Sequence, residues 1–333
     1  MQPRGEHRRC VPPHDDPTRD LLVEAAAVVR MVMRIVSLLP SATEIVCAVG
    51  AQQQLVGISH ECDFPPSVRG LPVLTRSRID PAGTSREIDA AVRETIRDAL
   101  SIYAVDDLAL GTIEPDVIFT QDLCEVCAVS LDDVRAAVSR LAQRESVQIV
   151  SLRPTRLVDV LDDIERVASV LGLAPAGREL RRVLEGRIRE ISVRAEQAKS
   201  RLRVASLEWI DPPMLGGTWM PDLIKLAGGI AVGVEPGALA PTIEAADLAR
   251  LAPDVIVAKP CGFTLDRALV ESDRIAALAR HVPAARVYVT DGNAYFNRPG
   301  PRLVESLEIM AACLHPDLFP DFAHAHAASI VTL

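Results

Sequence analysis

The chain lacks the sequence features of several protein classes. Its 333 residues carry a net charge of -9, so it has no excess of Lys and Arg with which to neutralise a nucleic-acid backbone. It contains no run of about 18 uncharged apolar residues, so we expect no membrane-spanning helix. Only 3% of its residues are aromatic, and its seven cysteines are too few and odd in number for a disulfide framework. These absences favour a globular protein with reduced thiols and no nucleic-acid partner.

The first 33 residues do not have the pattern of an export signal. Glu24 and Arg30 interrupt the apolar stretch, and no small-residue cleavage site follows. Met33 stands directly before the first predicted strand and is an alternative start to Met1. We therefore expect residues 1–33 to be a disordered or mis-assigned extension and the protein to be cytoplasmic. A true start further upstream would instead make it periplasmic or displayed at the cell surface.

Short apolar runs alternate with helical stretches along the rest of the chain. This alternation is typical of βα units and a mainly parallel sheet. The predicted strands form a first series at residues 34–39, 55–59, 116–120 and 148–152, and a second at 203–207, 230–232, 254–258 and 286–290. Between the two series, apolar residues recur three and four positions apart, which indicates one long amphipathic helix. The sequence therefore predicts an α/β fold of two Rossmann-like lobes with mainly parallel sheets, joined by a long rigid α-helix.

These patterns also set the expected boundaries. We place an N-terminal α/β lobe at 34–175, the bridging helix at 176–200, a C-terminal α/β lobe at 201–320 and a frayed tail at 321–333. The tail is rich in Ala and His, and terminal segments of this kind are commonly poorly ordered.

Side chains that could bind a ligand gather directly after the predicted strands. Ligands of open parallel sheets bind at the carboxyl ends of the strands, so these loops are the expected site. Six of the eleven aromatic residues lie in or near them, which favours a cleft for a flat or partly apolar ligand. The candidate ligand-binding residues are Pro40, Ser41, His60, Glu61, Asp63, Asp122, Glu208, Trp209, Trp219, Phe263, Tyr295, Phe296 and Arg298.

One of these loops has a second interpretation. Ser41 and Glu44 have the spacing of a capping box, which satisfies the free amides at a helix start. The same amides could meet an anion, but the cap is the favoured interpretation.

The imidazole and thiol side chains in these loops suggest a metal site. The candidate ligands are His60, Cys62, Cys124, Cys127 and Cys261, and thiolate and imidazole suit zinc, copper(I) or an iron–sulfur cluster. The single CxxC at Cys124 and Cys127 could also be a redox pair, although plain, partly buried thiols are the favoured interpretation. No GxSxG, HExxH, Walker A or GxGxxG motif is present, so we expect no catalysis. The alternative is a cytosolic metal- or cluster-binding protein or an enzyme that uses this Cys, His and carboxylate set.

Several longer motifs occur in an order that resembles a known family. They are Ser-Leu-Leu-Pro-Ser-Ala-Thr-Glu at 37–44, Asp-Phe-Pro-Pro at 63–66, Pro-Asp-Val-Ile at 115–118 and 253–256, Asp-Pro-Pro at 211–213, and Tyr-Phe-Asn-Arg-Pro-Gly-Pro-Arg at 295–302. From Arg34 to about Phe319 the chain resembles the Fe/B12 periplasmic-binding domain family of ABC-transporter substrate-binding proteins, and its loops are most similar to the cobalamin-binding branch.

The resemblance implies a function as well as a fold. It implies that cobalamin, or a related corrinoid or metal chelate, is held between the two lobes. His60 would contact the corrin, Tyr295 and Phe296 would line the second lobe, and Arg298 would lie near a polar substituent. A neutral His60 could also ligate cobalt.

The chain also departs from the family pattern. Family members are exported and dock onto a permease through one surface Glu in each lobe. Here Asp107 and Glu244 are out of register with those positions, and Glu87 lies in an inserted segment at about 76–102. An ABC permease is thus a partner that the resemblance implies without a clean match, and we expect a cytosolic offshoot of the family.

Overall fold

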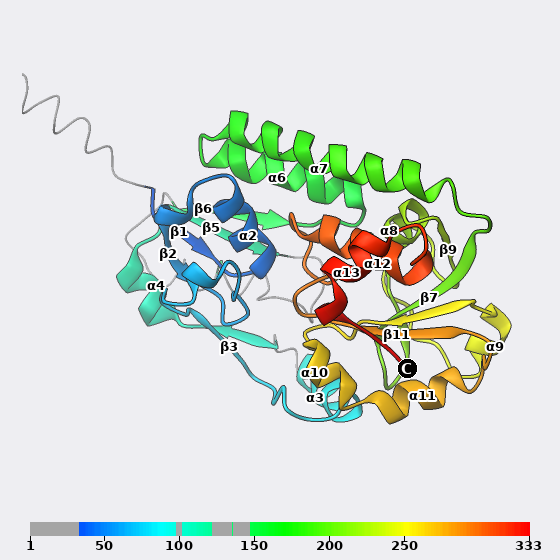
Figure 1. The fold of residues 1–333 in the computed structure, drawn as a ribbon. Coiled ribbons are helices and arrows are strands. Elements are labelled where there is room, and N and C mark those ends of the chain that lie inside the picture. Colours follow the sequence, from blue (N-terminus) through cyan, green and yellow to red (C-terminus); the bar gives the residue numbers. More distant parts are fainter. Residues whose placement is uncertain (1–32, 98–101, 122–134, 136–146) are drawn as a thin grey trace, which may run out of the picture. The chain divides into compact units, whose positions relative to one another are not determined.

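The computed structural model describes residues 33–97, 102–121, 135 and 147–333 (Figure 1). Residues 34–333 form one compact unit. That unit contains two separate, mainly parallel sheets with helices packed around them. The predicted α/β fold class is therefore confirmed.

The first lobe is built on a four-stranded parallel sheet. Its strands are β1 (Ile35–Ser37), β2 (Leu55–Ile58), β5 (Val117–Gln121) and β6 (Gln148–Leu152), in the order β2-β1-β5-β6. Its helices are α2 (Pro40–Ala48), α4 (Asp107–Ile113) and α6 (Leu157–Val170), with short 3-10 turns at Gln52–Gln54 and Pro66–Val68. The strands are mostly apolar because helices and loops cover both faces of the sheet, which is usual for parallel sheets.

The second lobe is built on a six-stranded sheet. Its strands are β7 (Leu202–Trp209), β8 (Met214–Leu215), β9 (Gly229–Ala231), β10 (Val255–Ala258), β11 (Arg286–Thr290) and β12 (Ile330–Thr332). The order is β12-β11-β10-β7-β8, and β9 pairs with β7. Its helices are α8 (Met220–Leu226), α9 (Asp247–Leu251), α10 (Leu265–Leu269), α11 (Ser272–Ala279) and α12 (Leu303–Leu314). Each of the eight predicted strands overlaps an observed one.

The last residues of the chain are ordered, so the predicted frayed tail is wrong. They form α13 (Pro320–Ala325), a 3-10 turn at Ala327–Ser329 and β12, which pairs antiparallel with β11. Arg194 fixes the start of this segment through hydrogen bonds to Asp321 at 2.9 and 2.5 Å. The partner strand lies about forty residues earlier, so local composition alone could not reveal the pairing.

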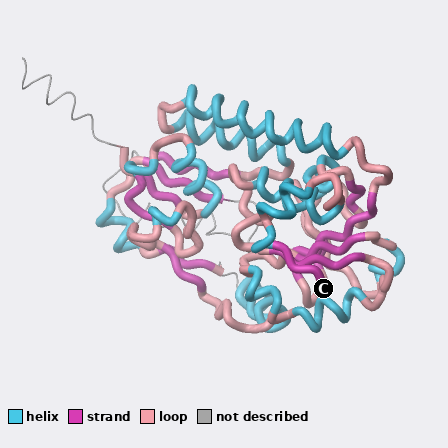
Figure 2. The backbone as a smooth tube through the Cα atoms, viewed as in Figure 1, coloured by secondary structure: helices cyan, strands magenta, loops and turns pink. Residues whose placement is uncertain are grey.

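A long helix, α7 (Ala174–Ala195), runs beside both lobes (Figure 2). It packs along α6, and a Cβ on Gly177 would overlap Ala168 of that helix, so the small residue allows the close approach. On the second lobe, Arg187 donates to Glu305 and Glu308 of α12 at 3.0 and 2.7 Å. Among the described residues, no helix is both long and apolar enough to cross a membrane.

One helix of the first half of the chain packs with the second lobe. Two short strands, β3 (Thr75–Ser77) and β4 (Tyr103–Val105), pair antiparallel, and α3 (Ser85–Arg97) lies between them in sequence. Ile88 of α3 is buried in the same apolar cluster as residues of β7, β10 and β11. The prediction that assigned all of 34–175 to the first lobe therefore does not hold for α3.

Candidate functional site

Loops that follow strands of the two lobes meet across the lobe boundary. Arg298, after β11, donates to Asp63 Oδ1 at 2.5 Å and to the carbonyl of Glu61 at 3.2 Å, both after β2. Asn293 donates to the other oxygen of Asp63 at 3.2 Å. Three predicted site residues are thus in contact, although Arg298 is more than 230 positions from Glu61 and Asp63 in sequence.

A second ion pair lies beside the first. Arg302 donates to both carboxylate oxygens of Glu44, at 2.9 and 2.5 Å, and its guanidinium lies 4.0 Å from the centre of the Phe64 ring. Arg298 Nη1 is 3.7 Å from the same carboxylate. We call Glu44, Asp63, Arg298 and Arg302 the inter-lobe ion cluster.

The ion cluster corrects the prediction for the helix that follows β1. Helix α2 begins at Pro40, Leu39 is its N-cap and makes no side-chain cap, and Ser41 is buried within the first turn. The Glu44 carboxylate is used by Arg302, so the predicted capping box of Ser41 and Glu44 is wrong. A long-range arginine fork binds a carboxylate bidentately, which a single backbone amide cannot match.

The two carboxylates of the ion cluster have opposite electrostatic character. Glu44 is only 3% exposed, and its burial raises the pKa above the ordinary value despite the Arg302 fork. Burial also opposes ionisation of Asp63, but the hydrogen bond and charge of Arg298, with the Asn293 hydrogen bond and the charge of Arg302, outweigh it and hold the Asp63 pKa below the ordinary value. The surroundings therefore favour the ionised form of Asp63 and disfavour that of Glu44.

One ring nitrogen of His60 is held by a hydrogen bond, and the other has no hydrogen-bond partner among the described residues. Its Nδ1 lies 2.7 Å from Thr75 Oγ1, and its backbone N–H donates to the same oxygen at 3.0 Å. Its Nε2 is buried and has no hydrogen-bond partner among the described residues; Glu61 Oε1 lies 3.4 Å away and would pair with a protonated ring. Imidazoles that ligate metals usually donate the N–H of the other ring nitrogen to a neighbouring acceptor, a role that Thr75 Oγ1 can take for one tautomer of His60.

The ring of His60 is also packed. Its centre lies 5.0 Å from that of Tyr103 on β4, at a tilt of 58°. The position of His60 after a predicted strand pointed to this residue, but no sequence signal pointed to Thr75 or Tyr103, which belong to the antiparallel pair β3 and β4.

A buried lysine lies at the carboxyl end of β10 in the second lobe. Lys259, directly after β10, is fully buried and donates to Glu208 at 3.1 Å and to Asn297 at 2.9 Å. A Cβ on Gly292 would overlap the carbonyl of Pro260, so glycine is required where the loop after β11 crosses the end of β10. This arrangement fixes the predicted site residue Glu208, and Lys259 could have been noticed as a charge that ends an apolar strand.

Three of the predicted cleft aromatics lie in the interior of the second lobe. Phe296, Phe263 and Trp219 are 0%, 5% and 6% exposed. Trp219 Nε1 donates to the Phe296 carbonyl at 2.7 Å, and the Phe296 amide donates to Ser306 at 2.9 Å. The prediction that they line a ligand cleft is wrong, because their loops fold back over the sheet and complete its core.

The remaining two predicted aromatics are less deeply buried. Trp209 packs edge-on against Phe263 at 5.2 Å between ring centres, and its indole N–H donates to the carbonyl of Ser85 at 3.1 Å. Tyr295 is half-buried, with its ring centre 5.8 Å from the Arg302 guanidinium. Of these two, Tyr295 lies beside the ion cluster, on which the Phe64 ring also packs.

The described thiols do not form a metal centre. Cys62 is 5% exposed, its Sγ lies 3.1 Å from Thr43 Oγ1, and burial raises the pKa of this thiol to about 11. Burial and the contact with Thr43 therefore leave Cys62 as a protonated thiol in this structure. Within residues 33–97, 102–121 and 147–333, no three His, Cys, Asp or Glu side chains, Cys261 included, come together as a metal site. Asp122, Cys124 and Cys127 lie outside the described residues.

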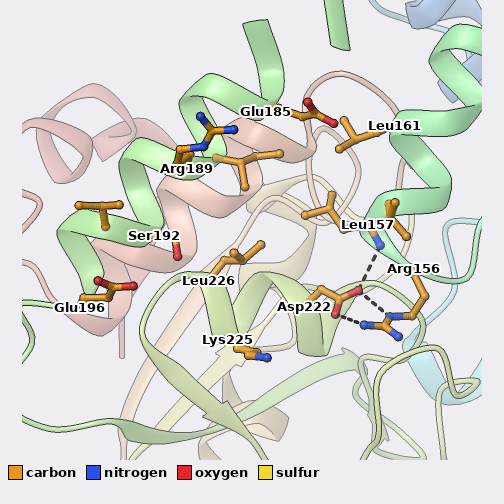
Figure 3. A pocket seen from close by; sticks show the side chains of 13 residues that line it. Arg156, Leu157, Leu161, Glu185, Arg189, Ser192, Glu196, Asp222, Lys225 and Leu226 are labelled. Carbon is orange, nitrogen blue, oxygen red and sulfur yellow. Dashed lines mark hydrogen bonds and ion pairs between the residues drawn. The ribbon is translucent and has the colours of Figure 1, made fainter. Parts of the chain in front are cut away.

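A large groove lies elsewhere, between α6, α7 and α8 (Figure 3). Its volume is about 710 Å³, and none of its lining residues is a predicted site residue. At one end Arg156 forms a double hydrogen bond with Asp222 at 2.8 and 2.7 Å. The groove is separate from the strand ends where the predicted residues gather.

Comparisons with known proteins agree with this architecture. No protein-family model matches the chain, and no curated protein matches its sequence. Among solved structures, the periplasmic vitamin B12-binding protein BtuF of Vibrio cholerae is 18% identical, with a TM-score of 0.61 over 85% of this chain and 96% of that one. The apo periplasmic heme-binding protein RhuT of Roseiflexus is 19% identical, with a TM-score of 0.64 over 86% and 99%.

A third structure is similar to the same extent. A periplasmic heme-binding protein of Pseudomonas aeruginosa is 18% identical, with a TM-score of 0.62 over 85% of this chain and 93% of that one. The chain has the fold of periplasmic substrate-binding proteins. These matches extend over almost the whole length of each relative, so the fold that the sequence resemblance implied is confirmed.

Proposed function

We propose that this protein binds cobalamin or a related corrinoid between its lobes, with His60 as an axial ligand of the cobalt. The observation that carries the proposal is the geometry of His60: Nδ1 is oriented by Thr75, and the buried Nε2 has no hydrogen-bond partner among the described residues. A buried polar nitrogen without a partner is costly, and a metal ion would satisfy it.

The position of His60 supports the same function. It lies two residues after the end of β2 and precedes Glu61 and Asp63, which contact the second lobe. Carboxyl ends of parallel strands are where ligands of such sheets bind. The vitamin B12- and heme-binding proteins that share the fold bind metal-bearing macrocycles, a class of ligand that an imidazole can ligate.

The alternative of a thiolate metal or cluster site has less support. Cys62 is buried and protonated at neutral pH, and the imidazole of His60 is oriented by an uncharged hydroxyl. We therefore propose binding rather than catalysis, with the ion cluster and Tyr295 beside the ligand.

A visible titration with hydroxocobalamin tests the proposal. Wild-type protein is expected to bind saturably and to shift the corrinoid spectrum, because an imidazole replaces water on cobalt. His60→Ala should abolish the shift, and Thr75→Val should weaken it because the ring loses its orienting partner. His281→Ala, at an exposed position in the second lobe, is the matched control and should behave as wild type.

Three other results would overturn all or part of the proposal. Saturable binding whose spectrum is the same in wild type and His60→Ala would remove His60 as the ligand. Binding of hemin with a His60-dependent spectrum, and no binding of hydroxocobalamin, would keep the site and replace cobalt with iron. No binding of either, with stoichiometric zinc or iron in the purified protein, would favour the metal-site alternative.

A further inference from the structure

An arm of the chain leaves the first lobe and docks on the second. The arm consists of β3, α3 and β4, and its base is attached to the first lobe because the amide of Leu74 donates to Ile58 at 2.8 Å and that of Asp106 donates to Leu74 at 2.8 Å. Its far end, α3, contacts residues of β7, α10 and α11.

A buried carboxylate of the second lobe caps the arm helix. Glu271 is 1% exposed and accepts hydrogen bonds from the amide and the hydroxyl of Ser85, at 2.9 and 3.0 Å. Arg274 donates to the same carboxylate at 2.7 Å. A carboxylate at a helix N-terminus satisfies free amides and interacts favourably with the helix dipole, so the arm and the second lobe share one capping interaction.

The docking surface also has an apolar part, beside a second ion pair in which Arg86 of α3 donates to Asp211 at 2.8 Å. Ile88 of α3 is 8% exposed and belongs to the core cluster that contains Phe263, with Trp209 and Val92 packed against it. The indole N–H of Trp209 donates to the carbonyl of Ser85, which joins the apolar contact to the capped helix end. Undocking would expose Ile88 and the two aromatic rings and leave Glu271 without the Ser85 donors, so α3 is held as part of the second lobe.

The arm therefore connects the lobes at a place separate from α7. In Figure 1, α6 and α7 run along one edge of the unit, and α3 lies with α10 and α11 at the opposite edge. A hinge motion that opens the lobes around α7 would have to pull α3 from its docking surface or stretch the segment between β3 and α3.

We propose that the arm is a clasp that holds the two lobes at a closed separation, so that ligands exchange slowly until α3 undocks. The docking does not depend on the identity of the ligand, whereas the effect on exchange rests on the function proposed above.

Trp209 provides a native reporter of docking, measured on the full chain without ligand. The chain has two tryptophans, and Trp219 is buried in contact with Phe296 away from the arm. Ile88→Asp should shift the tryptophan emission to the red and increase its quenching by acrylamide. Ala90→Asp places the same charge at an exposed position of the same helix and should leave both signals as in wild type.

Small-angle scattering on the same samples tests whether docking holds the lobes together. Ile88→Asp should increase the radius of gyration, and Ala90→Asp should not. Since Ile88→Asp could fail to fold, Ser85→Ala and Glu271→Gln are milder second variants, and circular dichroism checks that each retains its structure. A red-shifted Trp209 with an unchanged radius of gyration would overturn the clasp.

Ligand exchange is tested separately. If hydroxocobalamin binds, its release from Ile88→Asp should be about tenfold faster or more than from wild type. A tenfold change corresponds to a loss of about 1.4 kcal/mol in the free energy that holds the lobes closed. Equal release rates in Ile88→Asp and Ala90→Asp would refute the exchange part. Absence of any corrinoid binding would refute the proposed function while leaving the fluorescence and scattering results to decide on the clasp.

Discussion

Replacement of Arg298 by methionine tests whether the ion cluster joins the lobes. The guanidinium is 7% exposed and donates to Asp63, to the carbonyl of Glu61 and to Asn293 at 2.9 Å. Methionine keeps the apolar stem of the side chain and removes the charge and all of these donors. Glu44 retains the Arg302 fork, so the change acts mainly on Asp63.

The expected loss follows from the burial of each partner. A hydrogen bond to a charged group contributes roughly 1.5–3 kcal/mol, and breaking a fully buried ion pair costs about 3–5 kcal/mol. The Asp63 side chain is 41% exposed and regains water when Arg298 is removed, which reduces the loss. We therefore expect the free energy of unfolding to fall by about 2 kcal/mol at neutral pH.

The loss should also depend on pH with a defined sign. Because the folded-state pKa of Asp63 is below its ordinary value, its ion pair stabilises the folded state above the unfolded pKa of about 3.9, and this stabilisation disappears as the pH falls through the folded pKa. Arg298→Met should therefore cost most at neutral pH and progressively less below about pH 4.

Urea unfolding at several pH values, followed by circular dichroism, measures this loss. Arg182→Met is the matched control, because Arg182 is 71% exposed and pairs with Glu179 on its own helix. That control should change stability by about 0.5 kcal/mol or less. A loss for Arg298→Met no larger than that of the control, or one that is constant across the pH range, would refute the reasoning.

Three further predictions concern other parts of the molecule. Burial raises the pKa of Asp163 to about 6, so its charge destabilises the folded state as the pH rises through that value. Asp163→Asn should therefore raise the free energy of unfolding by about 2 kcal/mol at pH 8 and by little at pH 4. Equal gains at the two pH values would contradict this. Cys62 should resist iodoacetamide in the folded protein at pH 8 while half-buried Cys261 reacts sooner, as peptide mass spectrometry would show; equal rates would argue against the buried thiol. Truncation before Ile330–Thr332 removes β12 and should lower the unfolding free energy by about 1–3 kcal/mol, whereas an unchanged urea midpoint would mean that the strand adds nothing.

The sequence predicted the parallel sheets well and the edge elements poorly. Parallel strands are apolar runs that stand out against their surroundings, and each predicted run overlaps a strand. The strands β3, β4, β8 and β12 have only two or three residues, and their partners are chosen by long-range packing. The frayed-tail prediction failed for this reason.

The contrast between local sequence patterns and long-range packing also explains which residues of the candidate site could be predicted. The rule that ligands bind after parallel strands brought His60, Asp63 and Arg298 to notice, and the structure places Asp63 and Arg298 in contact. The same rule could not show that Arg302 pairs with Glu44, because that ion pair depends on how the two lobes pack together. Nor could it distinguish a loop aromatic that faces a ligand from one, such as Phe296, that completes the core.

Electron paramagnetic resonance of the cobalt(II) corrinoid complex tests axial ligation by His60 most directly. Cobalt(II) carries an unpaired electron that couples to an axial nitrogen, so protein labelled with nitrogen-15 only in histidine reports the ligand. We predict that the nitrogen triplet of the unlabelled complex becomes a doublet on labelling, and that the doublet is lost in His60→Ala but kept in His281→Ala. A spectrum that does not change on histidine labelling would contradict the account.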